Sequence, residues 1–398
     1  MVTSTSIFPL LGALSVASTL WTTTTAFPAG QSRSLFSEVN GTHIRAASTS
    51  SGSTSSSSSS YALTSSSDPV PLSADLRQLI TTKTTKFNGA AYCSSPFKGQ
   101  WKCGPLCDAV PDFQLTAWGG DGGVHQRYFV GWNPSSKEII ATRQGADFTH
   151  FATIPYALDF TYARLHPDIA QAFSRIPSLN TSTPSNSSTQ NILIGALAAL
   201  ASIFSPSKGN TSTADLIAHA RVNAGFQSAW AQSYPALRTA VEAQLAAHPD
   251  ARGIFVSGHS LGAALSVLDG VALRGAVKGS VIPVQVSVTG QPRVGNAVFA
   301  GLVDALGRDG SQKFAYHRVS HHHDPFVHLF PTVVGYEHSM NEIWLPDTNS
   351  SATSNAFFCS GRENQRCAAS VPTNSYSLLD HAGPYLGTII APLSSLAA

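Results

Sequence analysis

Residues 253–264 read Gly-Ile-Phe-Val-Ser-Gly-His-Ser-Leu-Gly-Ala-Ala, and this stretch decides the fold. Its first five residues form a short apolar run that predicts a buried strand, and the small and apolar residues from Ser260 to about Leu273 predict a helix. Between them stands the pattern G-x-S-x-G, which presents a serine hydroxyl on a tight turn. Its flanking glycines leave the room that such a turn requires. The strand and the helix favour a reactive serine over an unreactive one in an ordinary turn. The elbow around this serine consists of Gly258, His259 and Gly262.

The rest of the chain alternates strand signals with helix signals. Leu237, Val241 and Leu245 have helical spacing, and they predict a helix that starts after Pro235. Strands that alternate with helices indicate an α/β protein with a central, mainly parallel sheet flanked by helices. The other predicted strands are Gln126–Trp132 and Lys137–Thr142, joined as a hairpin, followed by Val281–Thr289 and Phe314–Val319.

Composition excludes several classes of protein. The chain has 398 residues, of which 42% are hydrophobic and only 12% are charged, and its formal net charge is +2. Without a cluster of Lys and Arg, such a charge argues against nucleic acid as a partner. No apolar run reaches the length of about 18 residues that a membrane-spanning helix requires. We therefore expect no integral membrane segment, and the sequence leaves the oligomeric state unknown.

The first 68 residues differ in composition from the rest. Residues 1–26 contain no charged side chain and resemble a signal peptide, with a buried N-terminal helix as the alternative. Residues 27–68 are rich in Ser and Thr, which predicts a disordered pro-segment or linker. The folded domain is then expected over residues 69–398. N-glycosylation sequons support secretion and occur at Asn40, Asn180, Asn186, Asn210 and Asn349.

A serine hydroxyl needs a base and an orienting acid before it becomes a strong nucleophile, and in α/β hydrolases these follow in the order Ser, acid, His. Asp324 follows the strand 314–319 through a short loop, which places it at the carboxyl edge of the sheet. Asp269 lies on the elbow helix and points away from that edge. His381 comes last in the chain and is the base that the order favours. The run of three His at 321–323 suggests a metal, but neighbouring side chains on a loop do not converge easily on one ion, so we expect no metal.

These residues resemble the fungal class 3 lipase family, which includes triacylglycerol lipases and feruloyl esterases. The resemblance covers about residues 91–386 and implies the α/β-hydrolase fold. It assigns Ser260 as nucleophile, Asp324 as acid and His381 as base, and it makes His338 structural. The matching pieces are Gly-His-Ser-Leu-Gly-Ala-Ala at 258–264, Gly-Gln-Pro-Arg-Val-Gly-Asn at 290–296, Asp-Pro-Phe-Val-His-Leu-Phe-Pro at 324–331, Gly-Tyr-Glu-His at 335–338, Glu-Ile-Trp at 342–344 and Asp-His at 380–381.

The resemblance also implies an oxyanion hole built from two backbone N–H groups, those of Leu261 and Ala146. Many members of the family carry Ser or Thr at the second position, and Ala146 offers only its N–H. Loss of one oxyanion donor costs about 100- to 1,000-fold in turnover elsewhere. The neighbours whose hydroxyl groups could replace the missing donor are Thr142 and Thr149.

A lid is expected after Ala146, and residues from about 174 to 214 resemble an insertion. The apolar run 191–204 within it is either a core helix or a cap over an apolar pocket. The aromatic and apolar residues of the expected lid or acyl groove are Phe148, Phe151, Ile154, Tyr156, Leu158, Phe160 and Tyr162.

The cysteines match the family in part. Cys103 with Cys107, and Cys359 with Cys367, resemble its two short-loop disulfides, which suit a secreted protein. Cys93 resembles one half of a third bridge whose partner is missing. It is therefore either free or bonded to Cys103 or Cys107.

Together these features predict a secreted, extracellular serine ester hydrolase that needs no cofactor. Its expected substrate is an acylglycerol, which it meets at a lipid–water interface. A feruloyl or other short-chain carboxylesterase is the alternative with the same triad. A catalytically silent surface-interaction protein on a hydrolase scaffold is the alternative of another class.

Overall fold

The computed structural model describes residues 68–123, 125–146, 159–176, 212–276, 282–309 and 311–391. The expected signal peptide, almost all of the expected linker, most of the expected insertion with its apolar run, and the greater part of the expected lid lie outside these residues. No helix in the described ranges is long and apolar enough to cross a membrane.

A nine-stranded sheet forms the centre of the fold, in the order β1-β13-β12-β10-β8-β7-β4-β3-β2. Pairing is parallel from β4 through β7, β8 and β10 to β12, and antiparallel towards both edges. The mainly parallel sheet of an α/β protein is therefore confirmed. The strands are β1 (Val70–Pro71), β2 (Gln114–Gly119), β3 (Tyr128–Asn133), β4 (Glu138–Arg143), β7 (Gly253–His259), β8 (Val284–Thr289), β10 (Phe314–His321), β12 (Glu342–Leu345) and β13 (Phe357–Cys359).

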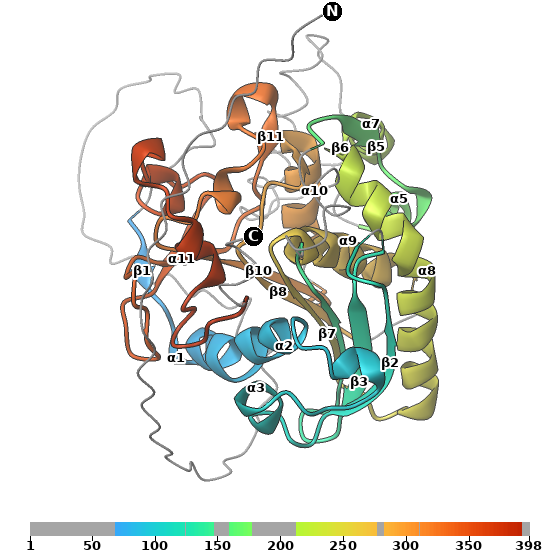
Figure 1. Cartoon of the computed structure of the whole chain (residues 1–398). Helices are drawn as coiled ribbons and strands as arrows, with labels where there is room; N and C mark the ends of the chain where they lie inside the picture. The colour runs from blue at the N-terminus through green and yellow to red at the C-terminus, as the bar shows by residue number, and fades with distance from the viewer. Residues whose placement is uncertain are drawn as a thin grey trace, which may run out of the picture. The chain divides into compact units, whose positions relative to one another are not determined.

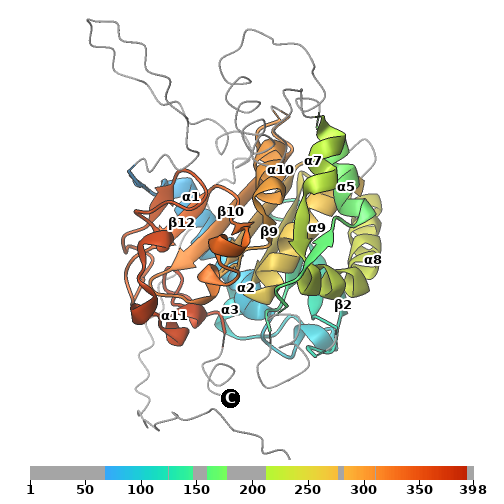
Figure 2. The ribbon, with the colours of Figure 1, turned by 90° about the horizontal axis from the view of Figure 1, so that it is seen from above.

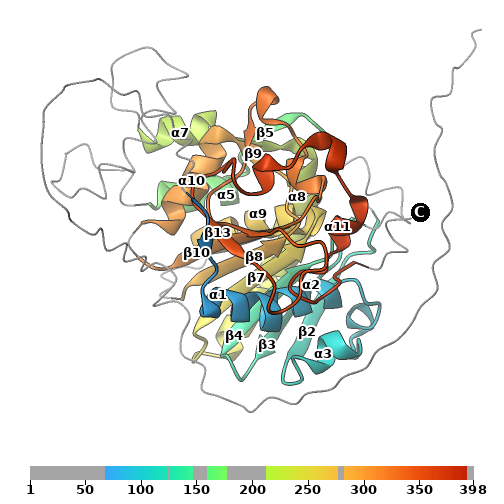
Figure 3. The same ribbon diagram turned by 90° about the vertical axis from the view of Figure 1, so that its left-hand side faces the viewer.

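Helices cover both faces of this sheet (Figures 1 and 3). One face carries α1 (Ala74–Leu79), α2 (Thr85–Ala90) and α3 (Pro105–Asp108). The other carries α5 (Pro167–Ser174), α8 (Ala224–Ala247), α9 (Leu261–Ala276) and α10 (Ala297–Gly307). Side chains alternate between the faces along each strand. In β7, Ile254 and Val256 join the larger core under α8 and α9, whereas Phe255 joins the smaller core with Phe87 of α2.

A small second sheet was not expected from the sequence. It has the order β11-β9-β6-β5 and antiparallel pairing, and its strands are only two or three residues long. Such short strands leave no alternating pattern to read. They are β5 (Tyr162–Arg164), β6 (Arg221–Asn223), β9 (Gly295–Asn296) and β11 (Tyr336–Glu337). Seen from above, α5, α7 (Thr213–His219), α8 and α10 gather on one side, away from α11 (Leu378–Ala382) (Figure 2).

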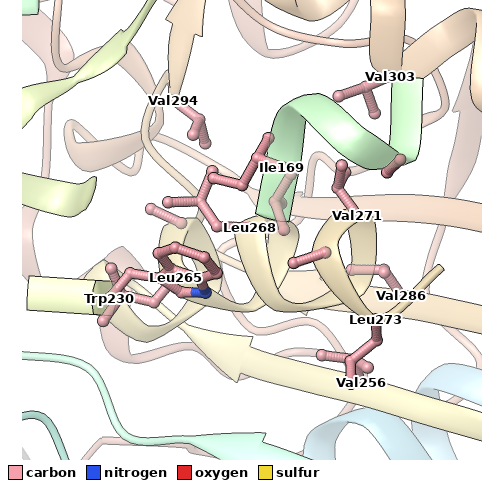
Figure 4. Packing of buried hydrophobic residues seen from close by; sticks show 14 of the residues in the cluster. Ile169, Trp230, Val256, Leu265, Leu268, Val271, Leu273, Val286, Val294 and Val303 are labelled. Atoms are coloured by element: carbon pink, nitrogen blue, oxygen red, sulfur yellow. The ribbon is translucent and has the colours of Figure 1, made fainter. Parts of the chain in front are cut away.

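Helix α9 follows the elbow and is buried on nearly all sides, which explains its small and apolar composition. Leu265, Leu268 and Val271 pack with Trp230 of α8 and with Val256 and Val286 of the sheet (Figure 4). A Cβ on Gly270 would lie 2.2 Å from Cγ2 of Val286, so glycine allows the close approach of helix and sheet.

One expected boundary is wrong. Helix α8 begins at Ala224 and continues through Pro235, which we expected to precede the helix. Proline inside a helix removes one hydrogen bond and costs about 3 kcal/mol. Asn223 caps the N-terminus by accepting a hydrogen bond from the N–H of Phe226, and Trp230 and Tyr234 are fully buried before the proline. Tertiary burial therefore outweighs the local signal.

A buried ion pair joins the end of β4 to α9. Arg143 and Asp269 are completely buried, with Nε–Oδ2 at 2.5 Å and the second guanidinium nitrogen 2.9 Å from Oδ1. The indole N–H of Trp230 donates to Asp269 Oδ1 at 2.9 Å, and Arg143 also donates to Ser233 Oγ. As expected, Asp269 does not face the site; it holds the helix against the sheet.

Asp269→Ala leaves the Arg143 guanidinium buried without its counter-ion, so we expect a loss of about 3–5 kcal/mol in the free energy of unfolding. Urea denaturation with and without the substitution measures this. The control is Asp250→Ala, which breaks a surface pair with Lys137 and should leave the urea midpoint nearly unchanged. Equal midpoints for Asp269→Ala and the parent chain would contradict the structural role.

Candidate active site

The elbow between β7 and α9 holds Ser260 in a strained backbone conformation. Its φ of +60° is unusual for a residue with a side chain. The turn can be this tight because Gly258 and Gly262 have no Cβ. A Cβ on Gly258 would lie 2.5 Å from the carbonyl oxygen of Gly262, and a Cβ on Gly262 would lie 2.3 Å from the carbonyl oxygen of Gln144. The N–H of Ser260 donates to the carbonyl of Thr289 at the end of β8. The sheet therefore fixes where the hydroxyl points.

The structure brings together the three side chains that the sequence singles out. Ser260 Oγ lies 2.7 Å from His381 Nε2, and His381 Nδ1 lies 2.8 Å from Asp324 Oδ2. All three side chains are buried, with residue exposures of 5%, 1% and 0% for Ser260, His381 and Asp324. Burial keeps water from competing for these hydrogen bonds.

Asp324 reaches the site because β10 ends at His321 and a short loop follows at the carboxyl edge of the sheet. The backbone N–H of Phe326 donates to Oδ1 at 2.7 Å, and the Tyr385 hydroxyl lies 3.5 Å from Oδ2. Oδ1 thus has a backbone donor and Oδ2 has the N–H of His381, which is what a buried carboxylate requires.

The His381 ring is closely packed by its neighbours. Phe326 stacks on it with ring centroids 3.9 Å apart. Gly290 has a φ of +59°, and a Cβ there would lie 2.9 Å from Cε1 of His381 and 2.9 Å from the Tyr385 hydroxyl oxygen. The space for the imidazole therefore depends on glycine at the start of the Gly-Gln-Pro-Arg-Val-Gly-Asn piece.

His259 links the elbow to the His381 loop. Its Nε2 donates to the carbonyl oxygen of His381 at 2.8 Å, and its Nδ1 lies 2.6 Å from the Tyr92 hydroxyl. Burial of the ring, reinforced by the neighbouring His381, lowers the pKa of His259 well below its usual value. The neutral ring then donates through Nε2 and accepts from Tyr92 through Nδ1. Sequence reasoning missed Tyr92 and Tyr385, because no local pattern marks either one.

The expected oxyanion donors lie on either side of the elbow. Leu261 is the first residue of α9, where backbone N–H groups are unpaired and the helix dipole favours negative charge. A Cβ on Gly145 would lie 2.9 Å from Cβ of Ser260, so the backbone leading to the buried Ala146 passes directly beside the serine. Thr142 is no substitute donor, since its hydroxyl pairs with Ser257 inside the sheet. Thr149 lies outside the described residues.

Only part of the expected lid can be placed. Residues 147–158 lie outside the described ranges, whereas Phe160 is 52% exposed and packs edge-on against Phe330. Tyr162 belongs to β5 and stacks on Tyr336. Cys103–Cys107 and Cys359–Cys367 are disulfide-bonded, and Cys93 is free and half-buried.

The other histidines near the site are buried or partly buried. His321 is fully buried, and His322 and His323 are partly buried. Burial lowers the pKa of His317 to about 4. His338 is buried and its Nε2 donates to the carbonyl of Val327, which fits a structural role.

This geometry can generate a nucleophile. The imidazole can take the proton of the Ser260 hydroxyl, and the carboxylate of Asp324 holds the ring and stabilises its charged form. Backbone N–H groups beside the serine can receive the negative charge of a tetrahedral intermediate. The arrangement suits acyl transfer.

Known proteins that resemble this chain are enzymes whose reaction, ester hydrolysis, is an acyl transfer. The family model Lipase (class 3) matches residues 193–334, a segment that contains Ser260 and Asp324. Secreted mono- and diacylglycerol lipase 1 of Fusarium solani is 35% identical over 158 residues, which are 39% of this chain and 44% of that protein. A lipase of Rhizopus niveus is 34% identical over 164 residues, 41% of this chain and 39% of that protein. The chain therefore matches less than half the length of these curated relatives.

Among solved structures, the native Rhizomucor miehei lipase propeptide complex superposes with a TM-score of 0.58. It is 20% identical and covers 85% of this chain and 91% of its own. At that identity the likeness shows the fold, and it confirms the α/β-hydrolase fold. The family match and the two lipase relatives confirm the resemblance to fungal class 3 lipases.

Gly290→Ala should displace the His381 ring, because the new methyl group meets both that ring and Tyr385. A misplacement of about 1 Å costs roughly 100-fold in rate. The measurement is the rate at which a fluorophosphonate probe labels Ser260. Gly307→Ala is the matched control, since its nearest neighbour would be 4.0 Å away. Equal labelling rates for both variants would show that His381 does not need this space.

Proposed function

We propose that this chain works as a class 3 lipase, a serine carboxylic ester hydrolase that cleaves acylglycerols at a lipid–water interface outside the cell. The observation that carries the proposal is the buried, hydrogen-bonded series Ser260–His381–Asp324 at an elbow with positive φ. Strain at that position persists only where the surrounding structure enforces it, and it leaves the hydroxyl at the carboxyl edge of the sheet.

The reaction follows from the positions of these groups. Ser260 Oγ attacks the ester carbonyl carbon while His381 Nε2 takes its proton. Asp324 stabilises the imidazolium that forms, and the N–H groups of Leu261 and Ala146 bind the oxyanion. As the intermediate collapses, His381 gives the proton to the leaving alcohol and the acyl group remains on Ser260. Water, deprotonated by His381, then releases the fatty acid, so this reaction needs no cofactor.

Acylglycerols are favoured as substrates by two observations. The relatives are named as lipases, one of them as a mono- and diacylglycerol lipase. Large apolar side chains are exposed close in sequence to the acid and the base: Val333 at 88% and Val334 at 52%, and Leu378 at 56% and Leu379 at 60%. Exposed apolar side chains of this kind suit contact with a lipid surface.

Secretion is supported by two disulfides within short loops, which persist in oxidising compartments, and by the name of the Fusarium relative. The low content of charged residues and the sequons agree with an extracellular protein.

Ser260→Ala removes the nucleophile and should reduce the hydrolysis of tributyrin and triolein by at least about 1,000-fold. Asp324→Asn should have an effect of about 10³- to 10⁴-fold, because the imidazole then adopts the wrong tautomer. Activity is measured by titration of released acid, and thermal melts confirm folding. The control is Asp121→Asn in an exposed turn. Hydrolysis that survives Ser260→Ala would disprove the mechanism.

Val333→Asp places a charge on the most exposed large apolar side chain of the described residues. It should lower the rate on emulsified triolein several-fold, because desolvating a charge opposes docking on lipid. The rate on dissolved p-nitrophenyl butyrate should not change. Val70→Asp, at a side chain of 54% exposure on β1, serves as the control. Equal losses on both substrates would contradict the interfacial role. A rate that does not rise above the solubility limit of the ester would favour a short-chain or feruloyl esterase.

A further inference from the structure

The end of β10 and the loop after it are joined to the region of α11 by several hydrogen bonds. The His321 ring lies 2.8 Å from the carbonyl oxygen of Asp380 on one side and 3.0 Å from that of Asp347 on the other. The N–H of Ser377 donates to the carbonyl of His323 at 3.0 Å. The loop and the helix therefore form one unit, although they are far apart in the sequence.

Three side chains of this unit converge. His322 Nδ1 donates to Asp380 Oδ2 at 2.7 Å, and the rings of His322 and His323 stack with centroids 3.8 Å apart. Each of the three residues offers one ligand atom, and these atoms lie within 4.8 Å of one another. The His323 imidazole makes no hydrogen bond to any side chain or backbone group in the described ranges, so its nitrogen atoms are available.

From the sequence we expected that adjacent histidines would not converge easily on one ion, whereas here their ligand atoms lie within 4.8 Å of each other and of that of Asp380. His322 has a φ of +39°, which turns the backbone between the two rings. The third group comes from a helix nearly 60 residues later, since His322 and Asp380 are 58 residues apart. Sequence reasoning considered only the residues next to one another.

We propose that His322, His323 and Asp380 bind one divalent transition-metal ion, for which Zn²⁺ is the best fit. Two imidazoles and one carboxylate form a donor set typical of zinc sites with three protein ligands and one water. Ca²⁺ and Mg²⁺ prefer oxygen ligands, so this donor set disfavours them.

The geometry requires only a small adjustment. Zinc–ligand bonds of about 2.0–2.2 Å place neighbouring ligand atoms of a tetrahedral site roughly 3.3 Å apart. Since the ligand atoms lie within 4.8 Å of one another, any pair needs to approach by at most about 1.5 Å. His322 and His323 are partly exposed, so their side chains can rotate while the buried Asp380 stays in place. The Thr348 hydroxyl lies 3.1 Å from His322 Nε2, and it can hold that ring while Nδ1 faces the ion.

The three ligand residues lie close to the catalytic acid and base in the sequence. His323 precedes Asp324, and Asp380 precedes His381, so one ion would cross-link the two segments that carry the acid and the base. An ion that binds only the folded chain raises its stability. This inference concerns metal binding and holds whatever ester the chain cleaves.

The test uses the full chain without a polyhistidine tag, freed of metal by chelation. Calorimetric titration with ZnCl₂ should show one site, and Co²⁺ should give the visible absorption of tetrahedral coordination. Zinc at about 100 times its Kd should raise the Tm by about 3–6 °C. CaCl₂ should cause neither heat nor a shift.

His322→Ala and His323→Ala should each weaken zinc binding by at least about 10-fold, which at the same zinc concentration reduces the rise in Tm by about half or more. His323→Ala is the decisive variant because it leaves the hydrogen bond between His322 and Asp380 intact. His125→Ala is the matched control, since His125 and Asp121 form an exposed His–Asp pair without a second histidine. Unchanged affinity in His323→Ala, or no binding by the parent chain, would overturn the proposal.

Discussion

The strained turn at Ser260 is the constraint on which the rest of the site depends. A φ of +60° is tolerated there because the surrounding backbone leaves no alternative: β7 leads in, α9 leads out, and the Ser260 N–H is bound to Thr289 at the end of β8. A residue in such a conformation is held in place by packing elsewhere in the fold. The parallel sheet and the buried helix α9 thus have a direct chemical consequence, since they keep one hydroxyl at a fixed position and direction.

The acid and the base reach this hydroxyl by a different route. Neither lies within a regular strand: Asp324 is on the loop after β10 and His381 is on the short helix α11. Short irregular segments are not rigid by themselves, so their positions come from hydrogen bonds between them. His259 and Tyr385 both donate to the carbonyl of His381, and His321 meets the carbonyl of Asp380. Hydrogen bonds between polar residues around the triad therefore fix the positions of the loops, as hydrophobic packing fixes the position of the sheet.

The difference between these two routes explains what the sequence could predict. Strands β7, β8 and β10 and helix α9 carry local periodic patterns, and the order of Ser, Asp and His leads to Ser260, Asp324 and His381. The contact between Tyr92 and His259 joins residues 167 positions apart and leaves no local signal. The same holds for Asp380 beside His322. The start of α8 was misjudged because Pro235 is a strong local signal that the burial of Trp230 and Tyr234 overrides.

Ala146 has no side-chain hydroxyl to donate to an oxyanion, and the fold suggests how its backbone N–H can suffice. Arg143 lies three residues before Ala146, and its ion pair with Asp269 ties that segment to α9, whose first residue is Leu261. Gly145 and Gly262 allow the two backbones to approach within van der Waals contact at the serine. The two N–H groups proposed to bind the oxyanion are thus attached to elements that one buried ion pair holds together. Donors fixed in advance need no reorganisation when charge develops, which is the main source of their effect. We infer that rigid backbone donors carry the stabilisation here, and that the missing side-chain hydroxyl is offset by how firmly those donors are held.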